Sequence, residues 1–183
     1  GGVSTQTRGL SVDNTGNVTV TGIVNLPFLG PDYYTFRYNT DGVLQWQADY
    51  DGGGSYDQVN AISRDAMGNI YITGTSQLSA SLPRDCVTIK YNSAGIQQWV
   101  RRYDGTVGGG DVGISLSLDA GGNIYISGAT DAGGQISGND YLTIKYSPSG
   151  AQQWIQTYNG PGNITDIAFS NAVDASGNVY VTG

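Results

Sequence analysis

Oxygen-bearing side chains, mostly aspartates, flank three glycine-rich segments at equivalent places in the chain, and carboxylates with this spacing could hold a metal cation. The segments run from Asp51 to Asp57, from Asp104 to Asp111 and from Asn159 to Asp166. Carboxylates and backbone carbonyls on loops are the ligands that Ca²⁺ prefers. An aspartate beside glycine also caps a turn through its own backbone, and no Asp-x-Asp-x-Asp loop is present. Two interpretations stay open, a Ca²⁺ site and a set of capped turns, and the sequence gives no firm metal site or other cofactor.

The residue types that the chain lacks exclude several kinds of catalysis. The chain contains no histidine, no glutamate and one cysteine, Cys86. A Ser-His-Asp or Cys-His arrangement lacks its base, and the usual zinc ligand sets lack their donors. A sialidase-like site would need a glutamate, and no aspartate pair is singled out for glycoside hydrolysis. We therefore expect a protein that is not an enzyme, and we assign no role to Cys86.

The net charge and the hydropathy of the chain limit the kinds of partner that it can bind. The formal net charge is -7 with only eight lysines and arginines, and nucleic-acid binding requires clustered basic residues. No apolar run approaches the roughly 20 residues that span a bilayer. The sequence therefore predicts neither a nucleic-acid partner nor membrane insertion.

An internal repeat organises the whole chain. The motif Asp-x-x-Gly-Asn starts at Asp13, Asp65, Asp119 and Asp174, and a short alternating strand that ends in glycine follows each copy. A segment Asp-x-x-Thr-x-(Lys/Arg)-Tyr comes next, then a turn and a strand centred on tryptophan. We assign a structural role to Asp65, Gly68, Asn69, Asp119, Gly122, Asn123, Asp174, Gly177, Asn178, Trp46, Trp99 and Trp154.

Each repeat is interpreted as four short strands. In the second copy we expect strands at 58–64, 70–73, 86–91 and 96–103, because hydrophobic residues alternate there with period two. Four antiparallel strands in a repeat near 50 residues are typical of a β-propeller blade. A stacked β-solenoid is the competing architecture, but its coils are usually shorter. The predicted fold is all-β, a β-propeller of four-stranded antiparallel blades.

The repeat resembles a known family. The runs at 65–74, 119–128 and 174–183, joined to Thr-Ile-Lys-Tyr and Gln-Gln-Trp, are similar to the SBBP β-propeller repeat of bacterial secreted and cell-surface proteins. The resemblance covers nearly the whole chain and implies an extracellular or cell-surface location without an assigned catalytic activity. The first copy departs from the pattern, since Thr19 replaces a tyrosine and Arg37 replaces a lysine.

The repeat divides the chain into about three and a half blades of one domain, residues 1–183. We expect blades at 1–50, 51–103 and 104–158 and a half-blade at 159–183. The chain starts at Gly1 and stops at Gly183 in mid-pattern, so we expect a piece of a larger propeller of seven or eight blades. The expected partners are the remaining blades, supplied by the same chain or by another copy of it.

The two faces of the predicted propeller differ. Loops of varying length, at 23–31, 75–84 and 129–139, lie on the face that carries the aspartates, and loops on a rigid scaffold often bind partners. We expect a non-enzymatic structural or interaction module that presents these loops. The alternative is a lectin-like propeller that binds surface glycans, assisted by Ca²⁺. The candidate ligand or Ca²⁺ face comprises Asp51, Asp57, Asp85, Asp104, Asp111, Asp140 and Asp166, with Asp32 at the matching place in the first repeat.

Overall fold

The structure is a computed structural model that describes residues 4–26, 30–53, 56–105, 109–131, 138–162 and 164–183. Strands and turns make up the described residues, without a helix. It follows that no described helix could cross a membrane. The expected loops at 23–31 and 129–139 fall partly outside the described residues, at 27–29 and 132–137.

Three antiparallel sheets of four strands follow one another along the chain, and a two-stranded sheet comes last. Blade 1 consists of β1 (Ser4–Val12), β2 (Val18–Leu26), β3 (Gly30–Tyr38) and β4 (Leu44–Tyr50). Blade 2 consists of β5 (Asp57–Arg64), β6 (Ile70–Gln77), β7 (Arg84–Tyr91) and β8 (Gln97–Tyr103). Blade 3 consists of β9 (Asp111–Leu118), β10 (Ile124–Asp131), β11 (Asn139–Tyr146) and β12 (Gln152–Tyr158). The half-blade consists of β13 (Ser170–Val173) and β14 (Val179–Thr182).

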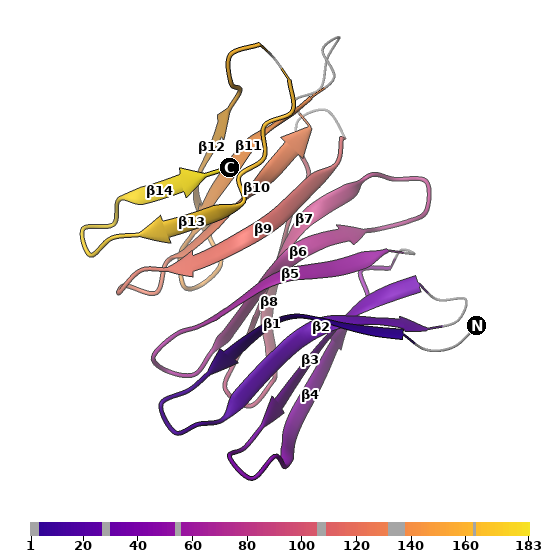
Figure 1. The fold of residues 1–183 in the computed structure, drawn as a ribbon, viewed down its shortest axis with the longest axis vertical. Coiled ribbons are helices and arrows are strands. Elements are labelled where there is room, and N and C mark those ends of the chain that lie inside the picture. Colours follow the sequence, from indigo (N-terminus) through magenta and orange to yellow (C-terminus); the bar gives the residue numbers. More distant parts are fainter. Residues whose placement is uncertain (1–3, 27–29, 54–55, 106–108, 132–137, 163) are drawn as a thin grey trace.

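The sheets are arranged as successive propeller blades, with their first strands next to one another. Figure 1 shows them fanned out with β1, β5, β9 and β13 side by side, and each of these strands contacts the next. The first strand of each sheet is therefore the innermost, and the later strands lie farther out. This arrangement confirms the predicted β-propeller fold, with about three and a half blades.

The core lies between blades, where an aliphatic face packs on an aromatic one. Blade 2 presents Ile70, Ile72, Val87 and Ile89 to the tyrosines and tryptophan of blade 1. Blade 3 presents Ile124, Ile126, Leu142 and Ile144 to Tyr71 and Trp99 of blade 2. Cys86 is buried in this second core, and burial raises the pKa of its thiol to about 12. Alternation along each strand thus places one set of side chains on each neighbouring blade.

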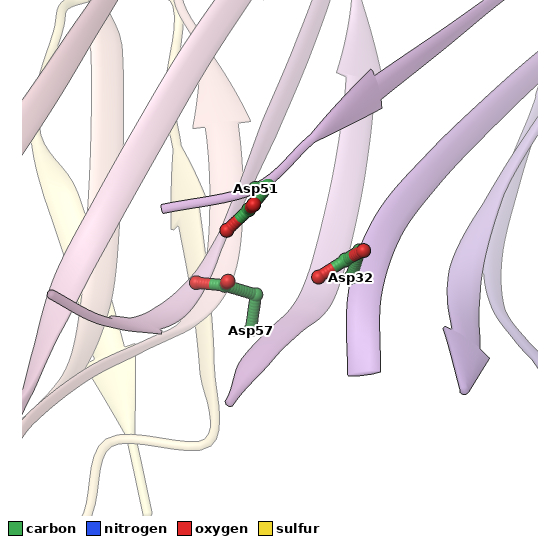
Figure 2. Close-up of side chains that lie close together, drawn as sticks. All are labelled: Asp32, Asp51 and Asp57. Atoms are coloured by element: carbon green, nitrogen blue, oxygen red, sulfur yellow. The ribbon is translucent and has the colours of Figure 1, made fainter. Parts of the chain in front are cut away.

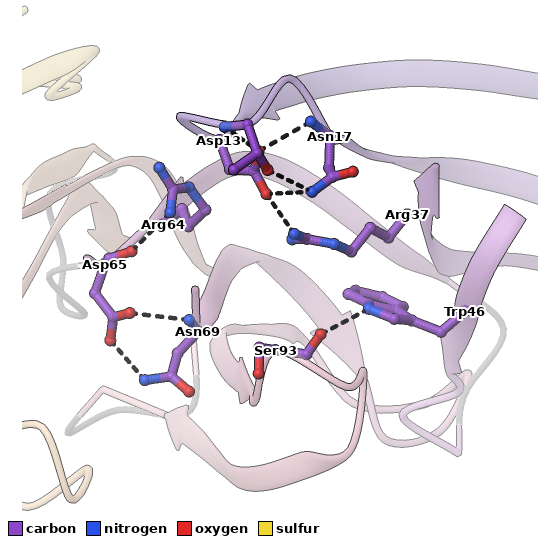
Figure 3. A network of polar contacts seen from close by, with 9 residues as sticks. Asp13, Asn17, Arg37, Trp46, Arg64, Asp65, Asn69 and Ser93 are labelled. Atoms are coloured by element: carbon purple, nitrogen blue, oxygen red, sulfur yellow. Dashed lines mark hydrogen bonds and ion pairs between the residues drawn. The ribbon is translucent and has the colours of Figure 1, made fainter. Parts of the chain in front are cut away.

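The Asp-x-x-Gly-Asn motif forms the tight turn between the first two strands of each blade. In blade 2, Asp65 Oδ1 accepts a hydrogen bond of 2.9 Å from the Asn69 backbone and Oδ2 one of 2.7 Å from the Asn69 side chain (Figure 3). Gly68 has a φ of 83°, in the left-handed region that favours glycine. The Tyr71 hydroxyl donates to the same Asp65 carboxylate.

Blade 1 replaces this tyrosine contact with an ion pair. Thr19 is buried but too short to reach the turn, and the Arg37 guanidinium contacts Asp13 Oδ2 at 2.5 Å instead (Figure 3). Hydrogen bonds from Asn17 and Thr15 hold the pKa of Asp13 well below its usual range. The two departures of the first repeat are therefore one coupled exchange.

In the three complete blades the glycine that follows the motif lies in mid-strand, not at the strand's end as the sequence predicts. In blade 2 the second strand continues past Gly74 to Gln77. A β-bulge at Asn60 in β5 brings the Gln58 carbonyl over this position, where a Cβ would lie 2.1 Å from the oxygen. The glycine is required by the partner strand's bulge, and the strand runs on beyond it.

The three tryptophans lie at the rim of the blade cores and are only partly buried. Trp46 Nε1 donates to the Ser93 carbonyl at 3.0 Å (Figure 3). Trp99 Nε1 donates to the Pro148 carbonyl at 3.3 Å. Each of these two bonds joins the last strand of one blade to the third turn of the next. Trp154 packs on Tyr125 with ring centroids 6.1 Å apart.

Candidate functional site

Three carboxylates converge where blade 1 meets blade 2. Asp32 lies on β3, Asp51 follows β4, and Asp57 is the first residue of β5. One oxygen from each lies within 4.8 Å of the others, and Figure 2 shows the three carboxylates around a shared space. We call these residues the first junction cluster.

The loop between the blades fixes Asp57 firmly. The Gly52 backbone N–H donates to Asp57 Oδ2 at 3.0 Å, and the Gly53 N–H donates to Asp51 Oδ1 at 2.7 Å. Asp57 is fully buried, and its Oδ1 accepts no hydrogen bond from the described residues. A buried carboxylate oxygen without a partner is costly, so this atom is placed to receive a ligand.

The carboxylates of the first junction cluster lie close enough to repel one another. Burial, together with repulsion from Asp51, Asp57 and Asp49, raises the pKa of Asp32 to about 6. Burial also raises the pKa of Asp57, although the nearby Ser76 hydroxyl, the hydrogen bond from Gly52 and the charge of Arg102 counteract this in part. The Ser76 hydroxyl lies beside Asp57 without the geometry of a hydrogen bond to Oδ1.

The same arrangement recurs where blade 2 meets blade 3. Asp85, Asp104 and Asp111 form the second junction cluster, again with one oxygen from each within 4.8 Å. The Gly105 N–H donates to Asp111 Oδ2 at 2.8 Å, and Asp111 Oδ1 is buried without a hydrogen bond from the described residues. Burial raises the pKa of Asp111.

An arginine distinguishes the two clusters. Arg102 Nη1 contacts Asp85 Oδ2 at 2.8 Å, and the same guanidinium donates to the carbonyl and hydroxyl of Ser76. The second junction cluster therefore has its own cation, although burial still raises the pKa of Asp85. The equivalent residue of blade 1 is Asp49, which adds a further negative charge near Asp32.

Asp49 and Arg102 are absent from the candidates chosen from the sequence. The position three residues after each tryptophan holds Asp49, Arg102 and Thr157, so it varies in charge while its neighbours repeat. This break in the repeat was the available signal. Its meaning depends on which carboxylates lie beside it, and only the packing of blades decides that.

The third junction keeps only part of the pattern. The Gly160 N–H donates to Asp166 Oδ2 at 2.7 Å, as in the other two junctions. Asp140 lies close enough for Asp166 to raise its pKa, in addition to the effect of burial. Asn159 stands where the other junctions have Asp51 and Asp104. The predicted residues are thus grouped by junction, as separate clusters of two or three carboxylates.

The first two clusters have dimensions that suit one Ca²⁺ ion each. Ca²⁺ binds oxygens at 2.3–2.6 Å, so two of its ligands can lie at most about 5.2 Å apart. The 4.8 Å limit within each cluster is compatible with that geometry. A proton or a basic side chain can also balance such buried charge.

Comparison with known proteins bears on the fold. The chain matches no family model, and no curated protein is similar to it. A solved gluconolactonase from Xanthomonas campestris, XC5397, has the same fold, with a TM-score of 0.52 and 17% identity over 95% of this chain and 52% of that one. The likeness is one of fold. A putative gluconolactonase gives a TM-score of 0.47 at 17% identity, over 94% of this chain and 53% of its own. The chain therefore spans about half the length of these structures.

This finding corrects two expectations from the sequence. The chain was expected to be a non-enzymatic structural, interaction or lectin-like module, and not an enzyme; both expectations are wrong, because the fold that it shares belongs to an enzyme. The exclusion failed for a chemical reason. It considered catalysis by histidine, cysteine and glutamate, whereas a cation held by aspartates can activate water without any of them.

Proposed function

We propose that this chain is a propeller segment that binds Ca²⁺ at the first junction cluster, Asp32, Asp51 and Asp57. The observation that carries the proposal is the buried Asp57 Oδ1, which lacks a hydrogen bond from the described residues and belongs to a cluster of three carboxylates. Oxygen ligands on loops, held at this spacing, fit a hard cation. The cation would relieve the repulsion that raises the pKa of Asp32 to about 6.

The first junction cluster is favoured over the second because it lacks an attached cation. Arg102 contacts Asp85 in the second cluster, whereas Asp32 faces Asp49 in the first. Binding of a divalent ion beside a guanidinium would cost Coulomb repulsion. We therefore expect one Ca²⁺ per chain, bound at the junction of blades 1 and 2.

Calorimetric titration of the chelator-treated protein with CaCl₂ tests this proposal. We expect one site with a dissociation constant of about 10⁻⁴ to 10⁻³ M, the range of extracellular modules, and a rise in Tm on binding. Binding should weaken below pH 6, because a protonated Asp32 is a poor ligand and its pKa is about 6. Asp57→Asn should reduce the affinity at least about tenfold, since it removes a ligand charge.

Two further variants make the result decisive. Asp51 is exposed, so Asp51→Asn should also weaken binding while leaving the fold intact. Asp41→Asn changes an exposed aspartate on a turn outside the cluster and should bind as the unchanged protein does. The absence of both a binding heat and a Tm change at about 10 mM Ca²⁺ would overturn the proposal.

A second candidate function is hydrolysis of a lactone at the bound cation. The fold shared with the gluconolactonase XC5397 favours it. Ca²⁺ would polarise the lactone carbonyl and its bound water. Attack by water would open the ring to a hydroxy acid and release one proton at neutral pH.

Proton release from gluconolactone in a weakly buffered solution measures this activity against the spontaneous rate. We expect a Ca²⁺-dependent rate above the blank, and a loss of at least about 100-fold with Asp32→Asn, which removes a ligand of the cation. Asp41→Asn serves as the matched control. If Ca²⁺ binds by calorimetry but the rate equals the blank, the hydrolytic proposal is wrong and the binding proposal stands.

A further inference from the structure

A polar pocket lies where the innermost strands of blades 2 and 3 meet, between two complete blades. Its volume is about 350 Å³, which is within the range of small-molecule sites. None of the three residues of the first junction cluster is among those that line it. The lining includes Tyr56, Gln58, Asn60, Arg84 and Asp111. We call this site the inner pocket.

The residues of the inner pocket break the repeat. Residues that build a blade recur from one copy to the next, as the turn aspartates do, whereas three residues of this lining differ from their equivalents in both neighbouring blades. A group of departures in one place indicates a role beyond the fold. Counted from the nearest repeated aspartate, Arg84 corresponds to Pro31 and Asn139, Asn60 to Arg8 and Ile114, and Tyr56 to Ser4 and Gly110.

A chain of hydrogen bonds fixes the two amide side chains of the inner pocket. The Gly113 carbonyl can only accept, so Asn60 Nδ2 donates to it, at 2.9 Å. Asn60 Oδ1 can likewise only accept, and Gln58 Nε2 donates to it at 3.0 Å. The Tyr56 hydroxyl then donates to Gln58 Oε1. Each amide therefore keeps a second N–H, which makes no hydrogen bond to any described residue.

Arg84 adds a positive charge that an aromatic ring holds in place. The carbon of its guanidinium lies 3.6 Å from the centroid of the Tyr56 ring. The ion pairs among the described residues use Arg37 and Arg102, so Arg84 has no carboxylate partner in this part of the chain. Stacking occupies the flat face of the guanidinium and leaves the N–H groups at its edge available to an oxygen ligand.

We propose that the inner pocket binds a small organic monocarboxylate. It presents the Arg84 guanidinium and the second N–H of Gln58 and of Asn60, so its available groups are hydrogen-bond donors and one of them is charged. Such donors match an anionic oxygen, and the planar guanidinium suits a carboxylate. Asp111 also borders the pocket, and its carboxylate opposes a doubly charged anion such as phosphate more than a singly charged one. This site is separate from the proposed Ca²⁺ site.

NMR titration of the ¹⁵N-labelled whole chain with sodium L-lactate, at constant ionic strength and without Ca²⁺, tests the proposal. The Arg84 Nε–H signal and the side-chain amide signals of Gln58 and Asn60 should shift together, with a dissociation constant of about 1–10 mM for so small a ligand. The signals of the exposed Gln153 side chain should not move. L-Lactamide has the shape of lactate without its charge, so it should bind at least about tenfold more weakly, and so should inorganic phosphate.

Variants at Arg84 separate charge from geometry. Arg84→Gln should weaken lactate binding at least about tenfold, and Arg84→Lys, which keeps the charge but loses the planar fork, should weaken it less. Arg84 is exposed, so the circular dichroism spectra should stay unchanged. Arg8→Gln removes an exposed arginine outside the pocket and should bind lactate as the unchanged protein does.

Four results would each overturn the proposal. They are the absence of a saturable shift up to about 100 mM lactate, equal affinity for lactate and lactamide, tighter binding of phosphate than of lactate, and equal weakening by Arg8→Gln and Arg84→Gln. Because the titration contains no Ca²⁺, none of them bears on the first junction cluster.

Discussion

Replacing Gly128 with alanine is expected to cost about 3 kcal/mol or more of unfolding free energy, the upper range for overpacking. A Cβ at this position would lie 1.8 Å from the Val112 carbonyl oxygen, and that atom belongs to the backbone of the adjacent strand. Neither strand can move away easily, because β10 is paired on both sides, with β9 and β11. Thermal unfolding followed by circular dichroism should show a Tm lowered by about 6–12 °C.

The matched control for this change is Gly110→Ala. Gly110 does not have a positive φ, and a Cβ there would lie 3.8 Å from the nearest heavy atom, the Arg84 carbonyl oxygen, which is an ordinary contact. Its effect should stay within about 0.5 kcal/mol. Equal Tm values for the two variants would show that the bulge beside Gly128 relaxes without cost, contrary to this prediction.

Asp119→Ala is expected to destabilise the protein by about 2–3 kcal/mol. Asp119 Oδ1 accepts a hydrogen bond from the Asn123 backbone, and Oδ2 accepts from the Asn123 side chain and from the Tyr125 hydroxyl at 2.9 Å. Tyr125 is fully buried, so the substitution leaves its hydroxyl without this partner. Urea unfolding at neutral pH measures the loss as a lower midpoint with an unchanged slope.

The fourth repeat provides the control for this loss. Asp174 makes the same bonds to Asn178 and Tyr180, but Tyr180 is 60% exposed and its hydroxyl can bond to water. Asp174→Ala should therefore cost only about 1 kcal/mol. An equal loss at both positions would show that the buried hydroxyl bond contributes nothing.

The pH dependence gives the Asp119 prediction a second readout. Burial favours the neutral acid, but hydrogen bonds from Asn123 and Tyr125 outweigh it and lower the pKa of Asp119 below 3.8. A lowered pKa in the folded state adds stability above pH 3.8, and that stability is lost as the pH falls through the folded-state value. The difference between Asp119→Ala and the unchanged protein should therefore shrink at acid pH.

Local chemistry explains why the strands and turns were predictable. The Asp65 turn closes through bonds to a residue four positions away, and Gly68 supplies the positive φ that such a turn requires. Alternation along β6 places Ile70 and Ile72 on one face and Tyr71 on the other, which the sequence pattern alone indicates. The sequence pattern ends that strand too early, because Gly74 is required by a β-bulge in the neighbouring strand and does not mark a strand end.

The candidate site was predictable only in part. Asp51 and Asp57 are brought together by a loop of their own segment, but Asp32 reaches them from β3, so their meeting depends on how one blade packs on the next. The sequence shows that Arg102 breaks the repeat, yet it does not show that this guanidinium neutralises Asp85 while Asp32 is left with Asp49. Charge balance at a junction is a property of two blades together.

The sequence by itself determined the repeat, the four-stranded blade and the turn chemistry, because all of these depend on residues a few positions apart. Only the tertiary structure decided which oxygen is left without a partner and which copy of an identical side chain is exposed. Tyr125 and Tyr180 have the same local sequence and the same hydroxyl bond, yet one is buried by the next blade and the other is not. Burial and charge balance depend on neighbours that are distant in the chain, and folding alone brings these together.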